Sequence, residues 1–145
     1  MLNEDKTQKI HREHEEGIEF AERMLAMIGA NDAEAESAFM QIKAYCDLEL
    51  EQHLQHEEMT LFAPLFRNYK AHQELARQLL QEHGRMRSFA RLFDANTPVE
   101  EVNEFLELLK AHSITEEEQL LPAISELFSE EEMKAIGDFT PLAKQ

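Results

Sequence analysis

Residues 53–64 read His-Leu-Gln-His-Glu-Glu-Met-Thr-Leu-Phe-Ala-Pro, and residues 112–122 read His-Ser-Ile-Thr-Glu-Glu-Glu-Gln-Leu-Leu-Pro. Each stretch places a histidine four residues before a glutamate, a second glutamate directly after it, and an apolar pair before a proline. Residues four apart lie one turn apart on the same face of an α-helix. The stretches therefore predict two helices that each present an imidazole and a carboxylate together, His53 with Glu57 and His112 with Glu116. Such pairs, offered twice, are what a two-metal site in a helical bundle needs.

The composition favours helix along the whole chain. The sequence has 145 residues, is 43% hydrophobic, and contains only four glycines and four prolines. Long alternations of Val, Ile and Thr, which would indicate strands, are absent from it. Since a chain of this length usually forms one domain, we expect a single all-α domain over residues 1–145.

Charge and cysteine content exclude several classes of protein. The formal net charge is −16, so the surface repels phosphate backbones and anionic lipid, and we expect neither nucleic-acid nor membrane partners. The single cysteine, Cys46, forms no intrachain disulfide and no cysteine-rich zinc or iron–sulfur site. Because no run approaches the ~18 apolar residues of a membrane span, we expect a cytoplasmic protein.

Helix-breaking residues cluster at three places, residues 29–32, 64–69 and 94–98. They divide the chain into four long helices and a short fifth, at about 4–29, 34–66, 69–93, 98–127 and 130–136. The expected core bundle is therefore about residues 4–127, with a short C-terminal helix within about 129–137. Thr97 and Pro98 have the pattern of a helix start with a hydroxyl cap, and Ser129 with Glu132 has that of a capping box.

Each long helix carries an apolar stripe that is interrupted by a histidine. The interruptions are His14, His53, His83 and His112, and the second and fourth stripes also contain Glu57 and Glu116. Polar groups buried in a core cost several kcal/mol, on the order of 2–7, unless they are satisfied. Four histidines and two glutamates in core positions therefore call for one shared explanation.

The spacing along the chain indicates that these six residues meet. Helices joined by short loops are antiparallel neighbours, so residues at the same height are equidistant from the loop between them. For His14, the 53–57 pair, His83 and the 112–116 pair, each midpoint between successive members falls on or near a predicted turn. The six side chains are thus predicted to form one layer and to bind metal. His11, Glu58, Glu117 and Tyr45 are candidates for supporting hydrogen bonds behind that layer.

The ligand set indicates the metal. If Glu57 and Glu116 bridge two ions, the four histidines supply about two nitrogens to each, and an oxo or hydroxo bridge leaves one position open on an octahedral ion. Mixed imidazole and carboxylate ligands suit iron, manganese or zinc, and a helical-bundle core suits two iron ions best. An open position beside a redox-active pair indicates chemistry with O2, NO or peroxide, or electron transfer.

At these residues the chain resembles the hemerythrin-like, or HHE cation-binding, domain family. The resemblance covers about residues 8–127 and rests on His14, His83 and the two His-x-x-x-Glu motifs with Pro64 and Pro122 behind them. It implies an up-down-up-down four-helix bundle that encloses a non-haem di-iron centre.

The chain departs from the oxygen-carrying members of that family. They have a second histidine four residues after the first on the third helix, where this chain has Arg87, and an aspartate on the fourth helix at the place of Glu117. The pattern is more similar to bacterial domains linked to NO or oxidative stress, to iron-centre repair, or to O2 and redox sensing.

These observations favour a protein that binds or senses O2 or NO, or takes part in a redox or nitrosative-stress response, with an electron-donor protein as a further partner. No obvious general acid or base accompanies the ligands, which favours binding over catalysis. The alternatives are a di-iron enzyme that consumes peroxide or NO, an iron-handling protein, and a plain helical adaptor. No particular oligomeric state is predicted.

Overall fold

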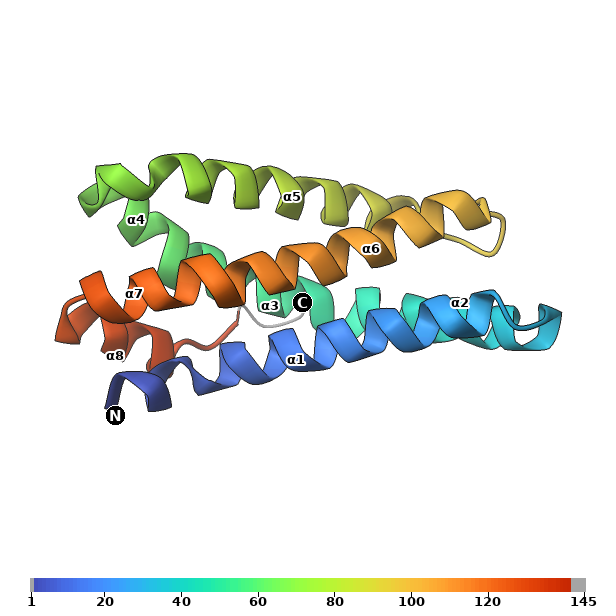
Figure 1. Cartoon of the computed structure of the whole chain (residues 1–145), viewed down its shortest axis with the longest axis horizontal. Helices are drawn as coiled ribbons and strands as arrows, with labels where there is room; N and C mark the ends of the chain where they lie inside the picture. The colour runs from blue at the N-terminus through green and yellow to red at the C-terminus, as the bar shows by residue number, and fades with distance from the viewer. Residues whose placement is uncertain (1, 142–145) are drawn as a thin grey trace.

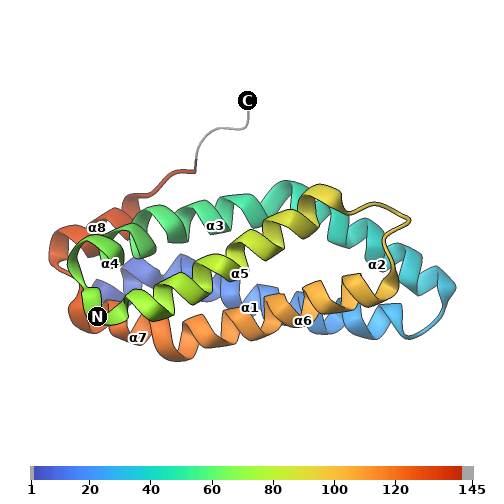
Figure 2. The ribbon, with the colours of Figure 1, turned by 90° about the horizontal axis from the view of Figure 1, so that it is seen from above.

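The computed structural model describes the backbone of residues 2–141 and the side chains of residues 6–141. Within these residues all regular structure is helical. Four long helices run up and down side by side, and a short fifth helix lies at the end of the bundle near the N-terminus (Figures 1 and 2). The predicted all-α bundle with a short C-terminal helix is confirmed.

The first long helix is α1 (Leu2–Ile28). The second is continuous and consists of α2 (Asp32–Tyr45), η1 (Cys46–Leu50), α3 (Glu51–Glu57), η2 (Glu58–Phe62) and α4 (Ala63–Asn68). A 3₁₀ turn, η3 (Lys70–His72), leads into the third, α5 (Gln73–Leu92). The fourth consists of α6 (Val99–Thr115), η4 (Glu116–Leu120) and α7 (Leu121–Leu127), and the chain continues into α8 (Glu130–Asp138). Each predicted helix is therefore present, with its ends displaced by a few residues.

Three of these segments, η1, η2 and η4, are π-helical. A π-helical segment accommodates an extra residue, rotates the side chains that follow, and is frequent at functional sites. Segment η2 begins directly after Glu57, and η4 begins at Glu116 itself. Two of the three interruptions thus adjoin the predicted bridging glutamates.

The two predicted helix caps have different outcomes. Ser129 forms the expected capping box with Glu132 at the start of α8. The prediction for Thr97 is wrong, because its hydroxyl accepts a hydrogen bond from the Asp94 amide within the turn, at 3.0 Å. Pro98 keeps a non-helical ψ of 142° and becomes the N-cap itself, so α6 begins one residue later.

The core consists of two apolar clusters on either side of a polar layer. One cluster lies toward the α1–α2 and α5–α6 connections and includes Met24, Ile42, Leu54, Met86, Phe105 and Leu109. The other lies toward α8 and includes Ile10, Phe62, Leu65, Leu79, Leu121 and Ile136. Five of the six predicted ligands are among the buried polar residues between them: His14 on α1, Glu57 on α3, His83 on α5, His112 on α6 and Glu116 on η4.

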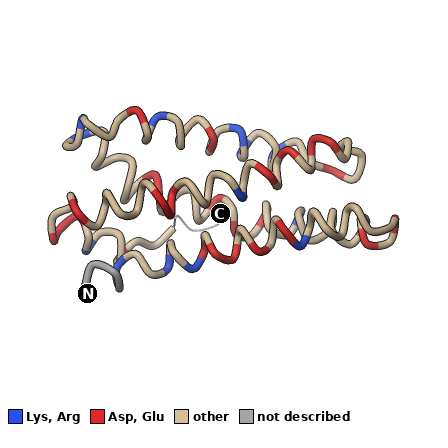
Figure 3. Tube along the Cα trace, in the orientation of Figure 1, with Lys and Arg blue, Asp and Glu red and all other residues tan. Residues whose placement is uncertain are grey.

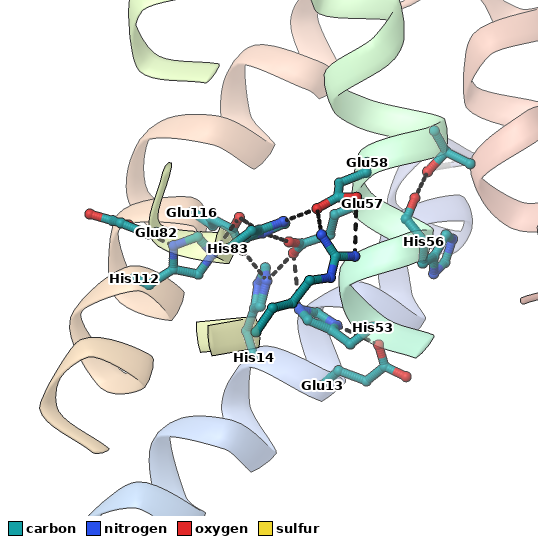
Figure 4. A network of polar contacts seen from close by, with 12 residues as sticks. Glu13, His14, His53, His56, Glu57, Glu58, Glu82, His83, His112 and Glu116 are labelled. Carbon is teal, nitrogen blue, oxygen red and sulfur yellow. Dashed lines mark hydrogen bonds and ion pairs between the residues drawn. The ribbon is translucent and has the colours of Figure 1, made fainter. Parts of the chain in front are cut away.

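Helix α8 closes one end of the bundle through His56. The Nε2 atom of His56 donates a hydrogen bond to the carbonyl oxygen of Ile136 at 2.8 Å, and its ring stacks on Phe139 with centroids 4.8 Å apart. His56 therefore has a packing role and points away from the polar layer (Figure 4).

Acidic residues are distributed along all of the long helices (Figure 3). Among the described residues, no helix is long and apolar enough to cross a membrane. Acidic residues are thus not confined to one helix of the bundle.

Candidate metal centre

The six predicted ligands converge in the middle of the bundle (Figure 4). His14 on α1 occupies the centre of the group, where its Nε2 atom lies 2.7 Å from Glu57 Oε2 and 2.7 Å from Glu116 Oε1. All three side chains are fully buried. Glu57 at the end of α3 and Glu116 at the start of η4 therefore approach the same point from two helices.

The other three histidines surround the two carboxylates. His53 Nε2 and His83 Nε2 each lie 3.0 Å from an oxygen of Glu57, and His112 Nε2 lies 2.9 Å from Glu116 Oε2. Only His53 among the four histidines has a side chain that is appreciably exposed, at 12%. The sequence therefore predicted correctly which side chains come together, and the metal ligation itself stays a prediction.

The donor atoms form two overlapping groups. One group of four consists of His14, His53, Glu57 and Glu116, and the other consists of Glu57, His83, His112 and Glu116. Within each group the donor atoms lie within 4.8 Å of one another. Because both glutamates belong to both groups, the arrangement is consistent with two cations that share two bridging carboxylates.

The hydrogen bonding around Glu116 fits a cation better than a polar network. His112 Nε2 and both Glu116 oxygens are buried and have no hydrogen-bond partner, although their contacts are as short as 2.7–2.9 Å. Buried polar atoms are nearly always hydrogen-bonded, so each exception requires a reason. A cation that accepts their lone pairs supplies one, and the imidazole and carboxylate donors present suit such an ion.

Proton binding to these groups reflects their mutual contacts. Burial alone would lower the pKa of His14, but the contacting carboxylates outweigh it and raise that pKa well above its usual value. The same balance raises the pKa of His53 to about 9 and that of His83 to about 11. Burial would raise the pKa of Glu57, but the surrounding histidines lower it well below its usual value. A bound cation would replace the Nε2 protons, because ligating imidazoles must be deprotonated.

A family model described as the hemerythrin HHE cation binding domain matches residues 5–124. The chain belongs to this family. No curated protein and no solved structure gives a significant match. The matched residues contain all six predicted ligands, and their buried histidines and glutamates form a cluster that is suitable for binding a cation.

In this hemerythrin domain, each of the four predicted histidine ligands also donates a hydrogen bond outward. In all four the Nε2 atom faces the centre and the Nδ1 atom faces a carboxylate on a neighbouring helix. The Nδ1 pairs are His14 with Glu117 at 2.6 Å, His53 with Glu13 at 2.7 Å, His83 with Glu58 at 2.8 Å, and His112 with Glu82 at 2.6 Å. A carboxylate in this position fixes the orientation of the ring and increases its basicity as a ligand.

The outer carboxylates form a closed ring around the bundle. The first helix supplies Glu13 to the histidine of the second, the second supplies Glu58 to the third, the third supplies Glu82 to the fourth, and the fourth supplies Glu117 to the first. The predicted supporting positions of Glu58 and Glu117 agree with this arrangement. Glu13 and Glu82 were not predicted.

His11 and Tyr45, the other two supporting candidates, lie differently. His11 donates to Glu117 at 2.7 Å, so it supports an outer carboxylate and belongs to neither donor group. Among the described residues, no hydrogen bond joins Tyr45 to any of the six ligands. Tyr45 lines a cavity of about 340 Å³ together with Glu13 and His53, and its ring stacks on Phe20.

Replacing Glu13 with alanine is expected to weaken metal binding by roughly 10–100-fold, as is usual when the hydrogen-bond partner of a ligating histidine is lost. The helix should be unaffected, because Glu13 is partly exposed and alanine favours helix. A competition titration with a chromophoric chelator measures the change. Glu15→Ala is the matched control, since Glu15 lies on the same helix and is exposed. Equal affinities of the two variants would contradict the prediction.

Proposed function

We propose that this hemerythrin domain holds two iron ions and reversibly binds a small diatomic molecule, O2 or NO. The observation that carries the proposal is the pair of overlapping donor groups that share Glu57 and Glu116. Two imidazoles and two shared carboxylates for each ion form a mixed nitrogen and oxygen ligand set, which suits iron in a helical bundle. Bound iron would supply an open coordination position and one-electron redox chemistry.

The protein contributes the positions of the ligands and the exclusion of water. Five of the six ligand side chains are at most 2% exposed, so they are held by packing before any ion arrives. The outer carboxylates keep each Nε2 atom directed inward. Rings fixed in this way support tight binding of a cation without further rearrangement.

The cavity beside His53 is the route by which we expect the small ligand to reach the centre. Gly17 contributes to its wall, and a Cβ atom at Gly17 would lie 3.9 Å from the Tyr45 hydroxyl and 3.8 Å from Ser113 Oγ. The glycine thus leaves space between α1 and its neighbours. Burial raises the pKa of Tyr45, so its phenol stays protonated and available as a hydrogen-bond donor at the cavity wall.

The function is tested by the absorption spectrum of the full chain, purified and iron-loaded without oxygen. We expect two iron ions per chain and a spectral change upon addition of O2 or NO that reverses when the gas is removed. Sustained consumption of NO or peroxide, at a rate above that of free iron, would favour the enzyme instead. A spectrum unchanged by either gas would rule out the binding function.

Replacing Gly17 with leucine is expected to slow ligand binding several-fold while the iron content stays at the wild-type level. The added side chain occupies part of the cavity beside His53 but removes no donor atom. Stopped-flow mixing of the iron-loaded protein with the gas measures the rate. Gly84→Leu is the matched control, because a Cβ at Gly84 meets nothing within 4 Å and lies outside this cavity. Equal slowing by both variants would exclude the cavity as the route.

A further inference from the structure

Arg87 lies one helical turn after His83 on α5 and contacts two glutamates of the second helix. Its Nε and Nη2 atoms donate to the two oxygens of Glu51 at 2.8 and 3.0 Å. Its Nη1 and Nη2 atoms donate to the two oxygens of Glu58 at 2.7 and 3.1 Å. The guanidinium therefore forms two bidentate pairs, the geometry in which arginine binds carboxylates most strongly.

Glu58 connects this arginine to the metal-binding layer. The same oxygen of Glu58, Oε2, accepts hydrogen bonds from Arg87 and, at 2.8 Å, from His83 Nδ1. His83 in turn directs its Nε2 atom to Glu57 at 3.0 Å. A positive charge is thus held at the outer end of a carboxylate–imidazole pair whose inner end faces the centre.

The other three outer carboxylates have no comparable partner. Glu117 contacts the imidazole of His11. The ammonium of Lys9, which is about half exposed, lies 4.0 Å from Glu13. Glu82 receives a 3.5 Å hydrogen bond from the uncharged amide of Gln78. Of the four outer carboxylates in the described part of the chain, Glu58 is thus the one whose charge is neutralised by an arginine.

The two metal positions are therefore electrostatically different. The position held by His14 and His53 is supported by carboxylates that keep most of their negative charge. The position held by His83 and His112 is supported by Glu82 and by a Glu58 that is compensated by Arg87. Since a ferric ion carries one more positive charge than a ferrous ion, reduced negative charge around it favours the ferrous state.

We propose that Arg87, acting through Glu58, raises the reduction potential of the iron held by His83 and His112 and so makes the two irons inequivalent. This inference rests on the proposed di-iron function. Arg87 is a positioning residue, since it touches neither donor group directly. Where the oxygen-carrying members of the family have a second histidine on this helix, this chain has Arg87. In our proposal Arg87 tunes the reduction potential of the iron that His83 binds.

The test is a redox titration of the anaerobically iron-loaded full chain, followed by its absorption spectrum with mediators present. Arg87→Gln is expected to lower the potential of one of the two irons and to leave the other near its wild-type value. Arg87→Lys keeps the positive charge but cannot form the two bidentate pairs, and it is expected to retain most of the wild-type potential. Arg85→Gln is the matched control and should behave as the wild type, since Arg85 lies on the same helix, is exposed and forms no ion pair with the described residues.

Glu58→Gln provides a sign test, because removal of the negative charge should move the same potential upward. The inference is wrong if Arg87→Gln leaves both potentials unchanged, if Arg87→Lys shifts the potential as far as Arg87→Gln, or if the Glu58 and Arg87 variants shift it in the same direction. Iron content and helical circular dichroism are measured on each variant first. A wild-type chain that holds no iron overturns the proposed function as well, whereas two irons with unchanged potentials overturn only the role of Arg87.

Discussion

Replacing Glu57 with glutamine is expected to reduce the iron content from the proposed two ions per chain to less than one. Glu57 belongs to both donor groups and is fully buried. It contacts His14, His53 and His83, which are three of the four histidines. Removing its charge therefore affects both metal positions, whereas loss of a single histidine affects one directly.

Glutamine nearly preserves the volume of the side chain, so the effect isolates the charge and the second oxygen. The amide nitrogen has no lone pair to offer a metal, so a bridge through both atoms is lost. We expect affinity to fall at least ~100-fold, a cost of roughly 2.8 kcal/mol at 1.4 kcal/mol per factor of ten. The cost falls on both ions because they share the bridge.

Metal analysis after anaerobic loading and desalting measures this outcome. Glu118→Gln is the matched control, since Glu118 lies two residues after Glu116 on η4 and is exposed. It should retain two ions. If the Glu57 variant also kept two ions and the wild-type affinity, Glu57 would be part of a structural polar network and the two-metal interpretation would be wrong.

The position of the six inner residues could be predicted because helix geometry determines it. The interval between His53 and Glu57 fixes their common face, and the midpoints between successive ligands fix their common height. Both quantities depend only on counting residues along regular helices with short connections. The structure places all six side chains together as predicted.

Glu13 and Glu82 could not be predicted from the apolar stripes, because they lie at the edge of their helices and are partly exposed. A signal was nevertheless present. Each outer carboxylate is adjacent in sequence to an inner ligand: Glu13 to His14, Glu58 to Glu57, Glu82 to His83 and Glu117 to Glu116. One residue turns a helix by about 100°, so the neighbour of an inward residue faces the adjacent helix. In a chain with 30 acidic residues, that adjacency gains meaning only once the inner ligands are known.

The π-helical segments have no comparable signal. They depend on a shift of backbone hydrogen bonds by one residue, which leaves the apolar pattern of a long helix nearly unchanged. Two of them begin beside Glu57 and at Glu116, in keeping with the frequency of π-helical segments at functional sites. The continuous helix predicted over 34–66 was therefore correct in extent but not in local geometry.

Removing the metal is expected to destabilise the fold more than any surface substitution. In the proposed function, two cations would join four helices at the layer between the apolar clusters, since the two donor groups draw on all four. Without them, Glu57 and Glu116 must be compensated by protonated histidines, and the buried contacts of Glu116 lack hydrogen-bond geometry. A ligand present at 1,000 times its dissociation constant stabilises the native state by about 4.1 kcal/mol. Each kcal/mol of change in the free energy of unfolding moves Tm by roughly 2–8 °C in domains of about this size. Chelation should therefore lower Tm by about 10 °C or more.

Thermal unfolding followed by circular dichroism, with and without a strong chelator and then with iron restored, measures this shift. The loss of Tm should reverse upon addition of about two equivalents of ferrous iron under anaerobic conditions, since both positions must be filled to bridge all four helices. The Glu57→Gln protein serves as the comparison, because a chain that holds little iron has little to lose to the chelator. A wild-type Tm that is indifferent to the chelator would mean that the cations contribute nothing to holding the helices together. The buried histidines and glutamates would then have to be stabilised by their own proton-mediated pairing, which the orphaned oxygens of Glu116 argue against.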